Sequence, residues 1–290
     1  MIEIFTQEYS YWNTENNVER KTFADGERYI RLPDVKNQEV VIYGGTINDS
    51  ATLDIFRMGC AAVKYGATKL TLVIPYFGYA RMERAVKSGE VVVAKTQARL
   101  LSAIPKAPLG NHIIMMDLHA DGITHYFEDS VFSQHVYGKE VVLEAIKEFG
   151  GDNYVLGSSD SGRSKWVESL ACELGVQPAF VYKKRIDGEH TEVTGIDADV
   201  NGKTVVIYDD LAMTGGTLIN AANAYREKGA IKVFAVCSHG VLPNNSIFKI
   251  ERFLDGMACT DSHPNALAAQ KLAPTFLKIK TVLPTLKKYL

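Results

Sequence analysis

The sequence predicts an α/β protein built from two similar domains, each with a mostly parallel sheet flanked by helices. Short apolar runs rich in β-branched residues alternate along the chain with helix-like stretches. A polar or glycine-rich turn follows each run, a pattern typical of parallel strands that are buried on both faces. One strand–helix segment also occurs twice, which indicates that the two domains form a pseudo-repeat.

Six apolar runs are the expected strands, because each is short and bounded by turn residues. In chain order they are Val40–Tyr43, Leu70–Ile74, Ile113–Met116, Tyr154–Gly157, Val205–Tyr208 and Val233–Cys237. Helices are expected between them, since parallel neighbours need a crossover connection.

The duplicated segment is VVIYGGTINDSATL (Val40–Leu53), which aligns without a gap to VVIYDDLAMTGGTL (Val205–Leu218). In both copies the helix that follows ends at a glycine, a residue that suits the end of a helix, and runs into another strand. The alternative is a chance similarity between two generic strand–helix–strand units. We expect a first domain over residues 1–138 and a second over 139–290, with roughly the last 12 residues packing back on the first.

Composition narrows the class of protein. The chain has 290 residues and a formal net charge of −2, which gives no overall attraction to nucleic acid or to a membrane surface. No apolar run approaches the ~20 residues of a membrane span, and the N-terminus lacks the pattern of a secretory signal. The four cysteines are scattered and show no zinc-binding spacing. We therefore expect a cytoplasmic protein with neither nucleic acid nor a membrane as a partner.

The two copies differ at the positions that carry chemistry. Asp209 and Asp210 stand where the first copy has Gly44–Gly45, and Gly215–Gly216 stand where it has Ser50–Ala51. The second copy therefore carries a site that the first lacks, which leaves the first domain available for another role, such as holding a nucleotide.

The second copy reads as a strand, two carboxylates and a small-residue turn that opens a helix. Two adjacent acids can accept hydrogen bonds from the vicinal hydroxyls of a ribose, at the strand end where open α/β sheets bind ligands. A Thr-Gly-Gly-Thr turn can wrap a phosphate with backbone N–H groups, assisted by the helix N-terminus. The alternative is an ordinary turn with solvated acids. The expected ribose and phosphate ligands are Asp209, Asp210, Ala212, Met213, Thr214, Gly215, Gly216 and Thr217.

This segment resembles the phosphoribosyl-diphosphate motif of phosphoribosyltransferases and of ribose-phosphate diphosphokinases (PRPP synthetases). Other segments resemble the diphosphokinases across nearly the whole chain. They are FADGE (23–27), PYFGYARMER (75–84), MDLHAD (116–121), SSDSG (158–162), VYKKR (181–185), SHG (238–240) and TDS (260–262). The resemblance implies two phosphoribosyltransferase-like domains and a homodimer or larger homo-oligomer, with FADGE meeting the ATP site of a neighbouring subunit.

The resemblance also implies site residues. The expected ATP ligands are Phe23, Asp25, Glu27, Arg81, Met82, Arg84 and His119. The catalytic residues are expected to be Lys183, Arg185 and His119, with the first two on a flap over the active site. Mg²⁺ prefers oxygen ligands and keeps waters, so we expect Asp160 to hold it directly or through water. The resemblance implies that His119 lies beside the phosphates and the metal, as a ligand of the metal or a donor to a phosphate. A purely structural histidine and solvated flap charges are the alternatives.

The implied activity is transfer of the β,γ-diphosphate of Mg-ATP to the anomeric hydroxyl of ribose 5-phosphate, giving PRPP and AMP. Some positions depart from the family pattern: Met82, Met213, Trp166 and Glu168. Because most of these lie at the acceptor end, ADP-ribose is an alternative acceptor, and its product would feed NAD synthesis.

Two further alternatives change the class of protein. A phosphoribosyltransferase would explain the DDLAMTGGT segment but not PYFGYARMER or the duplication. A non-catalytic regulatory subunit of a diphosphokinase complex would not need to retain residues suited to catalysis.

Overall fold

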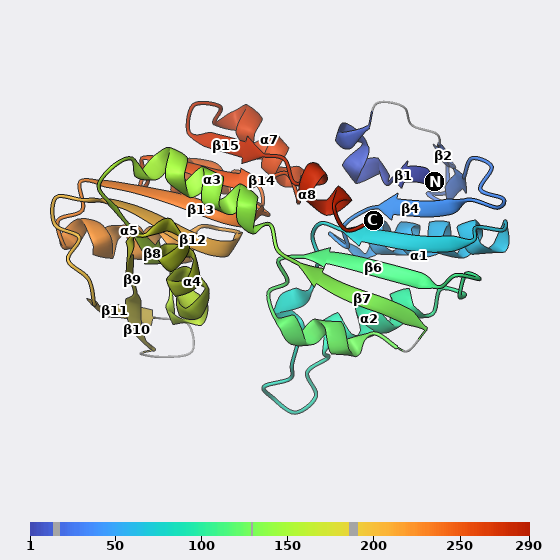
Figure 1. Ribbon diagram of the computed structural model, residues 1–290, viewed down its shortest axis with the longest axis horizontal. Helices are drawn as coiled ribbons and strands as arrows, with labels where there is room; N and C mark the ends of the chain where they lie inside the picture. Colours follow the sequence, from blue (N-terminus) through green and yellow to red (C-terminus); the bar gives the residue numbers. More distant parts are fainter. Residues whose placement is uncertain (14–17, 129, 186–190) are drawn as a thin grey trace. The chain divides into compact units, whose positions relative to one another are not determined.

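The protein folds into two compact units (Figure 1), one of Met1–Tyr137 with Leu283–Leu290 and one of Gly138–Val282. The computed structural model describes residues 1–13, 18–128, 130–185 and 191–290, without the side chains of residues 161, 183–185 and 191–194. Each unit is built around its own sheet, so each is described separately.

The first unit contains a five-stranded parallel sheet in the order β1-β4-β5-β6-β7. Its strands are β1 (Ile2–Phe5), β4 (Glu39–Tyr43), β5 (Lys69–Ile74), β6 (Asn111–Met116) and β7 (Val131–Val136). Its helices are α1 (Asp49–Lys64), α2 (Val93–Ser102) and α8 (Leu283–Lys287), with 3₁₀ turns η1 (Gln7–Trp12), η2 (Ala80–Met82) and η3 (Asp121–Tyr126). An antiparallel hairpin of β2 (Glu19–Thr22) and β3 (Arg28–Arg31) stands apart from the sheet.

The second unit contains a six-stranded parallel sheet in the order β15-β14-β13-β12-β8-β9. Its strands are β8 (Tyr154–Ser158), β9 (Gln177–Ala179), β12 (Thr204–Ala212), β13 (Lys232–Gly240), β14 (Gly256–Thr260) and β15 (Leu277–Lys280). Its helices are α3 (Lys139–Gly150), α4 (Ser164–Leu174), α5 (Gly216–Glu227), α6 (Ser246–Ile250) and α7 (Pro264–Leu272), with the 3₁₀ turn η4 (Ser161–Arg163). A separate antiparallel hairpin joins β10 (Val181–Arg185) to β11 (Thr191–Ile196).

The predicted fold class is confirmed, and all six apolar runs form strands of the two sheets. The sequence did not reveal five further strands, which are β1, β7, β9, β14 and β15. All five lie at or beside a sheet edge. The edge strand β7 carries polar residues at positions that a central strand would fill with apolar ones.

The duplication is visible in the backbone. In the first unit β4 leads through α1 to its parallel neighbour β5, and in the second β12 leads through α5 to its parallel neighbour β13. Both helices are followed by a glycine in the left-handed region, Gly66 at φ +92° and Gly229 at φ +93°. A side chain at this φ would be strained, so the two glycines end equivalent helices.

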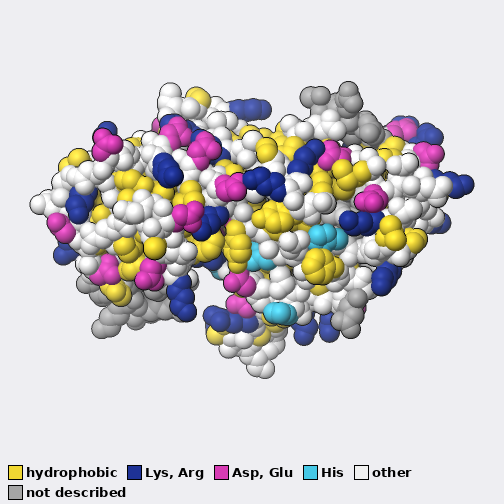
Figure 2. All heavy atoms as spheres, viewed as in Figure 1, with side chains coloured by type: hydrophobic (Ala, Val, Ile, Leu, Met, Phe, Trp, Pro, Cys, Tyr) yellow, Lys and Arg dark blue, Asp and Glu magenta, His cyan; other side chains and the backbone are white. Residues whose placement is uncertain are grey.

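Buried side chains cover both faces of the second sheet. One apolar cluster contains Val205 and Ile207 of β12, together with Tyr225. The residues between and after them on the strand, Val206 and Tyr208, belong to a second cluster. This alternation is the period of a strand with two buried faces. Figure 2 shows that Lys and Arg side chains are interspersed with Asp and Glu over the face in view. Among the described residues, no helix combines the length and apolarity needed to cross a membrane.

Candidate active site

The acidic pair lies at the carboxyl end of β12. The strand continues four residues beyond the apolar run, so Asp209 and Asp210 belong to the strand itself and not to the turn after it. Both are buried, with 8% and 5% of their surface exposed. Two charges with so little access to water need specific partners.

Asp209 is held by hydrogen bonds from two directions. The Ser159 hydroxyl donates to its Oδ2 at 2.7 Å, and the backbone N–H of Asp210 donates to its Oδ1 at 2.9 Å. Burial, and next the charge of Asp210, raise the pKa of Asp209 to about 8. The pair therefore shares its negative charge unequally near neutral pH, because two adjacent carboxylates in a buried site resist double ionisation.

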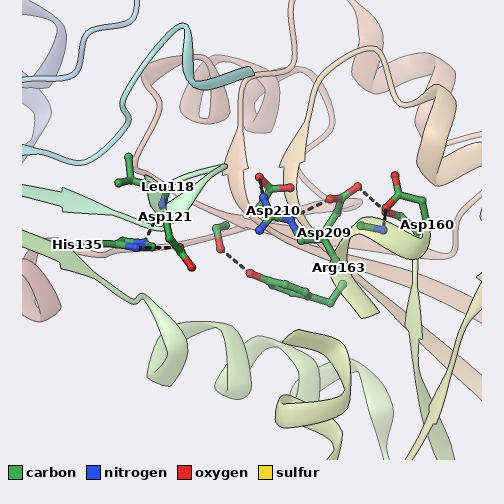
Figure 3. A network of polar contacts seen from close by, with 11 residues as sticks. Leu118, Asp121, His135, Asp160, Arg163, Asp209 and Asp210 are labelled. Carbon is green, nitrogen blue, oxygen red and sulfur yellow. Dashed lines mark hydrogen bonds and ion pairs between the residues drawn. The ribbon is translucent and has the colours of Figure 1, made fainter. Parts of the chain in front are cut away.

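Asp210 pairs with an arginine that the sequence interpretation did not single out. The Arg163 Nη2 donates to Asp210 Oδ2, and the Arg163 side chain is only 21% exposed (Figure 3). Arg163 follows SSDSG directly, and its position next to that segment was the only available signal. The same segment turns back on itself, since the Gly162 N–H donates to Asp160 Oδ1 at 2.9 Å. The structure therefore brings the SSDSG segment and the acidic pair together.

The turn after β12 requires glycine. Gly215 has φ +80°, and a Cβ there would lie 2.3 Å from Ile250 Cγ1, so both backbone conformation and space exclude a side chain. α5 begins at the next residue, and its first internal bond runs from the Ile219 N–H to the Gly215 carbonyl at 2.8 Å. The first N–H groups of a helix have no acceptor within it, which makes this turn suited to a phosphate.

The first unit fills the equivalent space with its own chain. A Cβ on Gly44 would lie 2.4 Å from Thr6 Cγ2, and one on Gly45 would lie 2.1 Å from the Tyr9 hydroxyl. The N-terminal strand and η1 therefore pack where the second unit keeps its two acids. The first copy of the repeat therefore has no room for two side chains at the positions of Asp209 and Asp210.

The SHG and TDS segments meet beside the acidic strand. The Thr260 hydroxyl donates to the Ser238 carbonyl, and His239 Nδ1 lies 2.7 Å from the Ser262 hydroxyl. His263 Nδ1 accepts from the Asn265 N–H and so begins α7. Burial, and next His239, lower the pKa of His263 to about 3, which keeps that ring neutral.

The FADGE segment forms the tip of the β2–β3 hairpin. The Phe23 N–H donates to the Glu27 carbonyl at 2.8 Å, and the Glu27 N–H donates to Asp25 Oδ1 at 3.0 Å. Phe23, Asp25 and Glu27 are all exposed, and the Phe23 ring packs edge-on against Tyr29. The hairpin thus presents an aromatic ring and two carboxylates to solvent, as a base-binding element would.

PYFGYARMER leaves the carboxyl end of β5 as a loop. The backbone at Tyr79 is left-handed, with φ +62°, and η2 follows it. Arg81, Met82 and Arg84 are exposed, and Arg84 Nε lies 3.3 Å from the Glu83 carboxylate. Exposed arginines at the end of a parallel strand are suited to bind phosphate oxygens.

The DLHAD segment forms a turn after β6. Asp117 is left-handed at φ +42°, and His119 is exposed. His135 of β7 stabilises this turn, because its Nε2 accepts from the Leu118 N–H at 2.9 Å while its Nδ1 lies 3.2 Å from Asp121 Oδ1 (Figure 3). Since Nε2 accepts, the ring proton lies on Nδ1 and points to Asp121.

The expected flap residues Lys183 and Arg185 lie on β10, but their side chains are outside the described part of the structure. The segment that follows, residues 186–190, also lies outside it. Among the described residues, no group of three or more His, Cys, Asp or Glu side chains gathers as a metal site would. Mg²⁺ bound mostly by substrate phosphates needs only one or two protein carboxylates, and Asp160 fits that requirement.

Two units that each hold a parallel sheet flanked by helices, with a buried acidic pair before a glycine turn in the second, have the features expected of phosphoribosyltransferase-like domains. The N-terminal domain of ribose phosphate pyrophosphokinase matches residues 11–104, and the phosphoribosyl synthetase-associated domain matches residues 175–284. The chain belongs to the ribose-phosphate pyrophosphokinase family.

The chain is similar to known members of this family over most of its own length and of theirs. Ribose-phosphate pyrophosphokinase from Thermococcus kodakarensis is 31% identical over 91% of this chain and 91% of its own. The enzyme from Marinomonas sp. is 35% identical over 83% of this chain and 77% of its own. The crystal structure of phosphoribosylpyrophosphate synthetase from Mycobacterium smegmatis superposes with a TM-score of 0.83 at 25% identity, covering 100% of this chain and 97% of that one.

Proposed function

We propose that this chain transfers the β,γ-diphosphate of Mg-ATP to the anomeric hydroxyl of ribose 5-phosphate, giving PRPP and AMP. The observation that carries the proposal is the buried acidic pair of β12 directly before a glycine turn at the N-terminus of α5. The two carboxylates can accept from a ribose diol, and the helix N-terminus can donate to a 5-phosphate. The relatives named above support the same activity.

In the proposed reaction the sugar O1 attacks Pβ and releases its proton, while the bond from Pβ to the bridging oxygen on Pα breaks and AMP departs with that oxygen. Asp209 and Asp210 hold the two ring hydroxyls, and Thr214–Thr217 hold the 5-phosphate through backbone N–H groups and hydroxyls. Lys183 and Arg185 stabilise the charge on the migrating group. Each role fixes position or charge, which is most of what phosphoryl chemistry requires of a protein.

The nucleotide is assigned to the first unit. Arg81 and Arg84 are proposed to bind the triphosphate, and Phe23 and Glu27 on the hairpin tip the base of the ATP held by a neighbouring subunit. His119 is proposed to contact the phosphates or the metal. Bound Mg²⁺ would neutralise phosphate charge, with Asp160 as a ligand either directly or through water. We further propose a cytoplasmic homodimer or larger assembly.

ADP-ribose is the second candidate acceptor, and Met213 favours it. This residue gives the phosphate turn an apolar, partly exposed side chain at the acceptor end, where a charged group would disfavour an extended substrate. ADP-ribose offers the same diol and anomeric hydroxyl, so the acidic pair serves either acceptor.

The deciding experiment measures AMP release from Mg-ATP with ribose 5-phosphate, with ADP-ribose and with no acceptor. The proposal expects AMP and a diphosphorylated sugar in equal amounts with one of the two acceptors. Equal AMP release with and without acceptor would indicate hydrolysis instead. Absence of AMP under all three conditions would favour a non-catalytic subunit.

A further inference from the structure

The segment that follows β8 contacts both members of the acidic pair. β8 and β12 are parallel neighbours in register, so the residue after β8 lies beside the first acid of β12. The Ser159 hydroxyl donates to Asp209 Oδ2 at 2.7 Å. Further along the same segment, Arg163 Nη2 donates to Asp210 Oδ2. The residues between these two contacts include Asp160, the proposed ligand of Mg²⁺.

Arg163 is an unfavourable residue for its place in the fold. It is the N-cap of α4, and its side chain makes no capping hydrogen bond. The N-cap position favours Ser, Thr, Asp or Asn, and the positive end of the helix dipole disfavours a cation there. The guanidinium therefore does not stabilise α4. What it contributes is its contact with Asp210, whose side chain is only 7% exposed.

The charge of Arg163 matters for the proposed reaction. That reaction places a diphosphate on the anomeric oxygen, next to the diol that the acidic pair is proposed to hold. Figure 3 shows three carboxyl groups beside Arg163, those of Asp160, Asp209 and Asp210. Negative charge that gathers in a partly buried site repels an incoming anion. The guanidinium compensates the charge of Asp210, and it belongs to the same segment as the proposed metal ligand.

We propose that Arg163 is a positioning residue of the acceptor site, which orients Asp210 toward the ribose diol and compensates its charge where the diphosphate arrives. This inference rests on the proposed function in assigning the acidic pair to the diol and Asp160 to the metal. Arg163 thereby determines how strongly the site favours the diphosphorylated sugar over the acceptor. Without this cation the site still binds the acceptor, but transfer is slower because negative charge builds up beside Asp210.

Three variants separate charge, orientation and folding. Arg163→Gln keeps a donor for Asp210 and removes the positive charge. Arg163→Lys keeps the charge but loses the planar fork that fixes a carboxylate. Ser159→Ala removes the other contact of the same segment without changing any charge. The matched control is Arg226→Gln, because Arg226 pairs with Asp255 at 2.6 Å in the same unit but at the start of β13.

The readouts are the affinities for the acceptor and for its diphosphorylated product, together with kcat and the melting temperature. Calorimetry is done with Mg²⁺ and without AMP, so that the reverse reaction cannot proceed. Ribose 5-phosphate and PRPP are the first pair of ligands. ADP-ribose and its purified product replace them if that acceptor supports AMP release.

We expect Arg163→Gln to weaken product binding about tenfold more than acceptor binding, and to lower kcat by a similar factor. Arg163→Lys should keep the wild-type ratio of the two affinities while binding both ligands a few-fold more weakly. Ser159→Ala should weaken both equally, since it removes no charge. Arg226→Gln should match the wild type in both affinities and in kcat.

The ratio of two affinities measured on one preparation does not depend on the fraction of protein that is folded, so the test holds even if Arg163→Gln is less stable. A wild-type ratio in Arg163→Gln would overturn the inference. An equal loss of the ratio in Arg163→Lys would overturn it too, because that variant keeps the charge.

Binding needs no turnover, so the experiment distinguishes failure of this inference from failure of the proposed function. If the wild type binds both ligands but releases no AMP with any acceptor, the proposed function fails while the ratio still tests Arg163. If the wild type is active and Arg163→Gln keeps its ratio and its kcat, only the role of Arg163 fails. A wild type that binds neither sugar would overturn both.

Discussion

Replacing Asp209 by Asn tests the assignment of the sugar site most directly. The substitution keeps the shape of the side chain and removes its charge. Its partners can adapt, because the Ser159 hydroxyl can accept as well as donate, and an amide oxygen can still accept from the Asp210 N–H. The variant should therefore fold, and any loss should reflect the contact with the acceptor.

The expected loss follows from the strength of one bond to a charged group. Such a hydrogen bond contributes about 1.5–3 kcal/mol, so acceptor affinity should fall by about tenfold to a hundredfold above pH ~8, where Asp209 is ionised, and by less at lower pH. ATP affinity should hardly change, since the nucleotide is assigned to the other unit. Asp210→Asn should lose a similar factor and should also be less stable, because it removes the partner of the partly buried Arg163.

The pH dependence provides a second signature of Asp209. Its pKa is raised in the folded state, so between its unfolded value near 3.8 and about 8 the native protein binds the extra proton. Stability therefore falls as pH rises through this window, and Asp209→Asn should flatten that part of the curve. Because the charged form binds the diol better, wild-type acceptor affinity should rise as pH increases toward 8.

Calorimetry with a non-hydrolysable ATP analogue, followed by titration with the acceptor, measures both affinities on one sample. Asp255→Asn is the matched control, since Asp255 also pairs with an arginine, Arg226, at 2.6 Å. It lies at the start of β13, whereas the acidic pair lies beside the end of that strand. A 2-deoxyribose acceptor should bind the wild type poorly and should lose little more in the Asn variant that removes the partner of the 2-hydroxyl, because both changes remove the same bond. Asn variants that lose ATP affinity and keep acceptor affinity would show that the two units have been assigned in reverse.

Three further outcomes are expected. Lys183→Ala and Arg185→Ala should each lower kcat by roughly a hundredfold to a thousandfold with little effect on ATP binding, and near-normal turnover would remove the flap assignment. Chelation should abolish activity and Mg²⁺ should restore it, with Asp160→Ala and His119→Ala raising the Mg²⁺ requirement; full activity without a divalent ion would contradict the mechanism. His263 is neutral when folded, with a pKa lowered to about 3, so its contribution to stability is present above pH 6.5 and is lost as pH falls. Urea unfolding of the wild type should show a loss of about 2 kcal/mol by pH 5 from this residue, and His263→Asn, which can still cap α7, should lack it.

The local sequence determined those features that depend on short stretches of chain. Buried parallel strands need continuous apolar runs, and a close turn before a helix needs glycine, so the central strands and the turn at Gly215 were predictable. The duplication was also visible in the sequence, because both copies join two parallel strands through a helix and keep similar residues to do so.

Only the tertiary structure decided which distant side chains meet. Arg163 reaches Asp210 across 47 positions of sequence, and His135 reaches the Leu118 N–H across 17, and neither arginine nor histidine carries a local signal for such a partner. The same holds for Arg28 and Asp54, whose pairing depends on how the hairpin packs against α1. Edge strands such as β7 escaped prediction for a related reason, since neighbouring strands and helices supply the burial that the local pattern does not show. Sequence patterns indicate whether a segment is buried and which backbone conformation it adopts. The chemistry of a site depends on contacts between distant side chains, which exist only after the segments have packed.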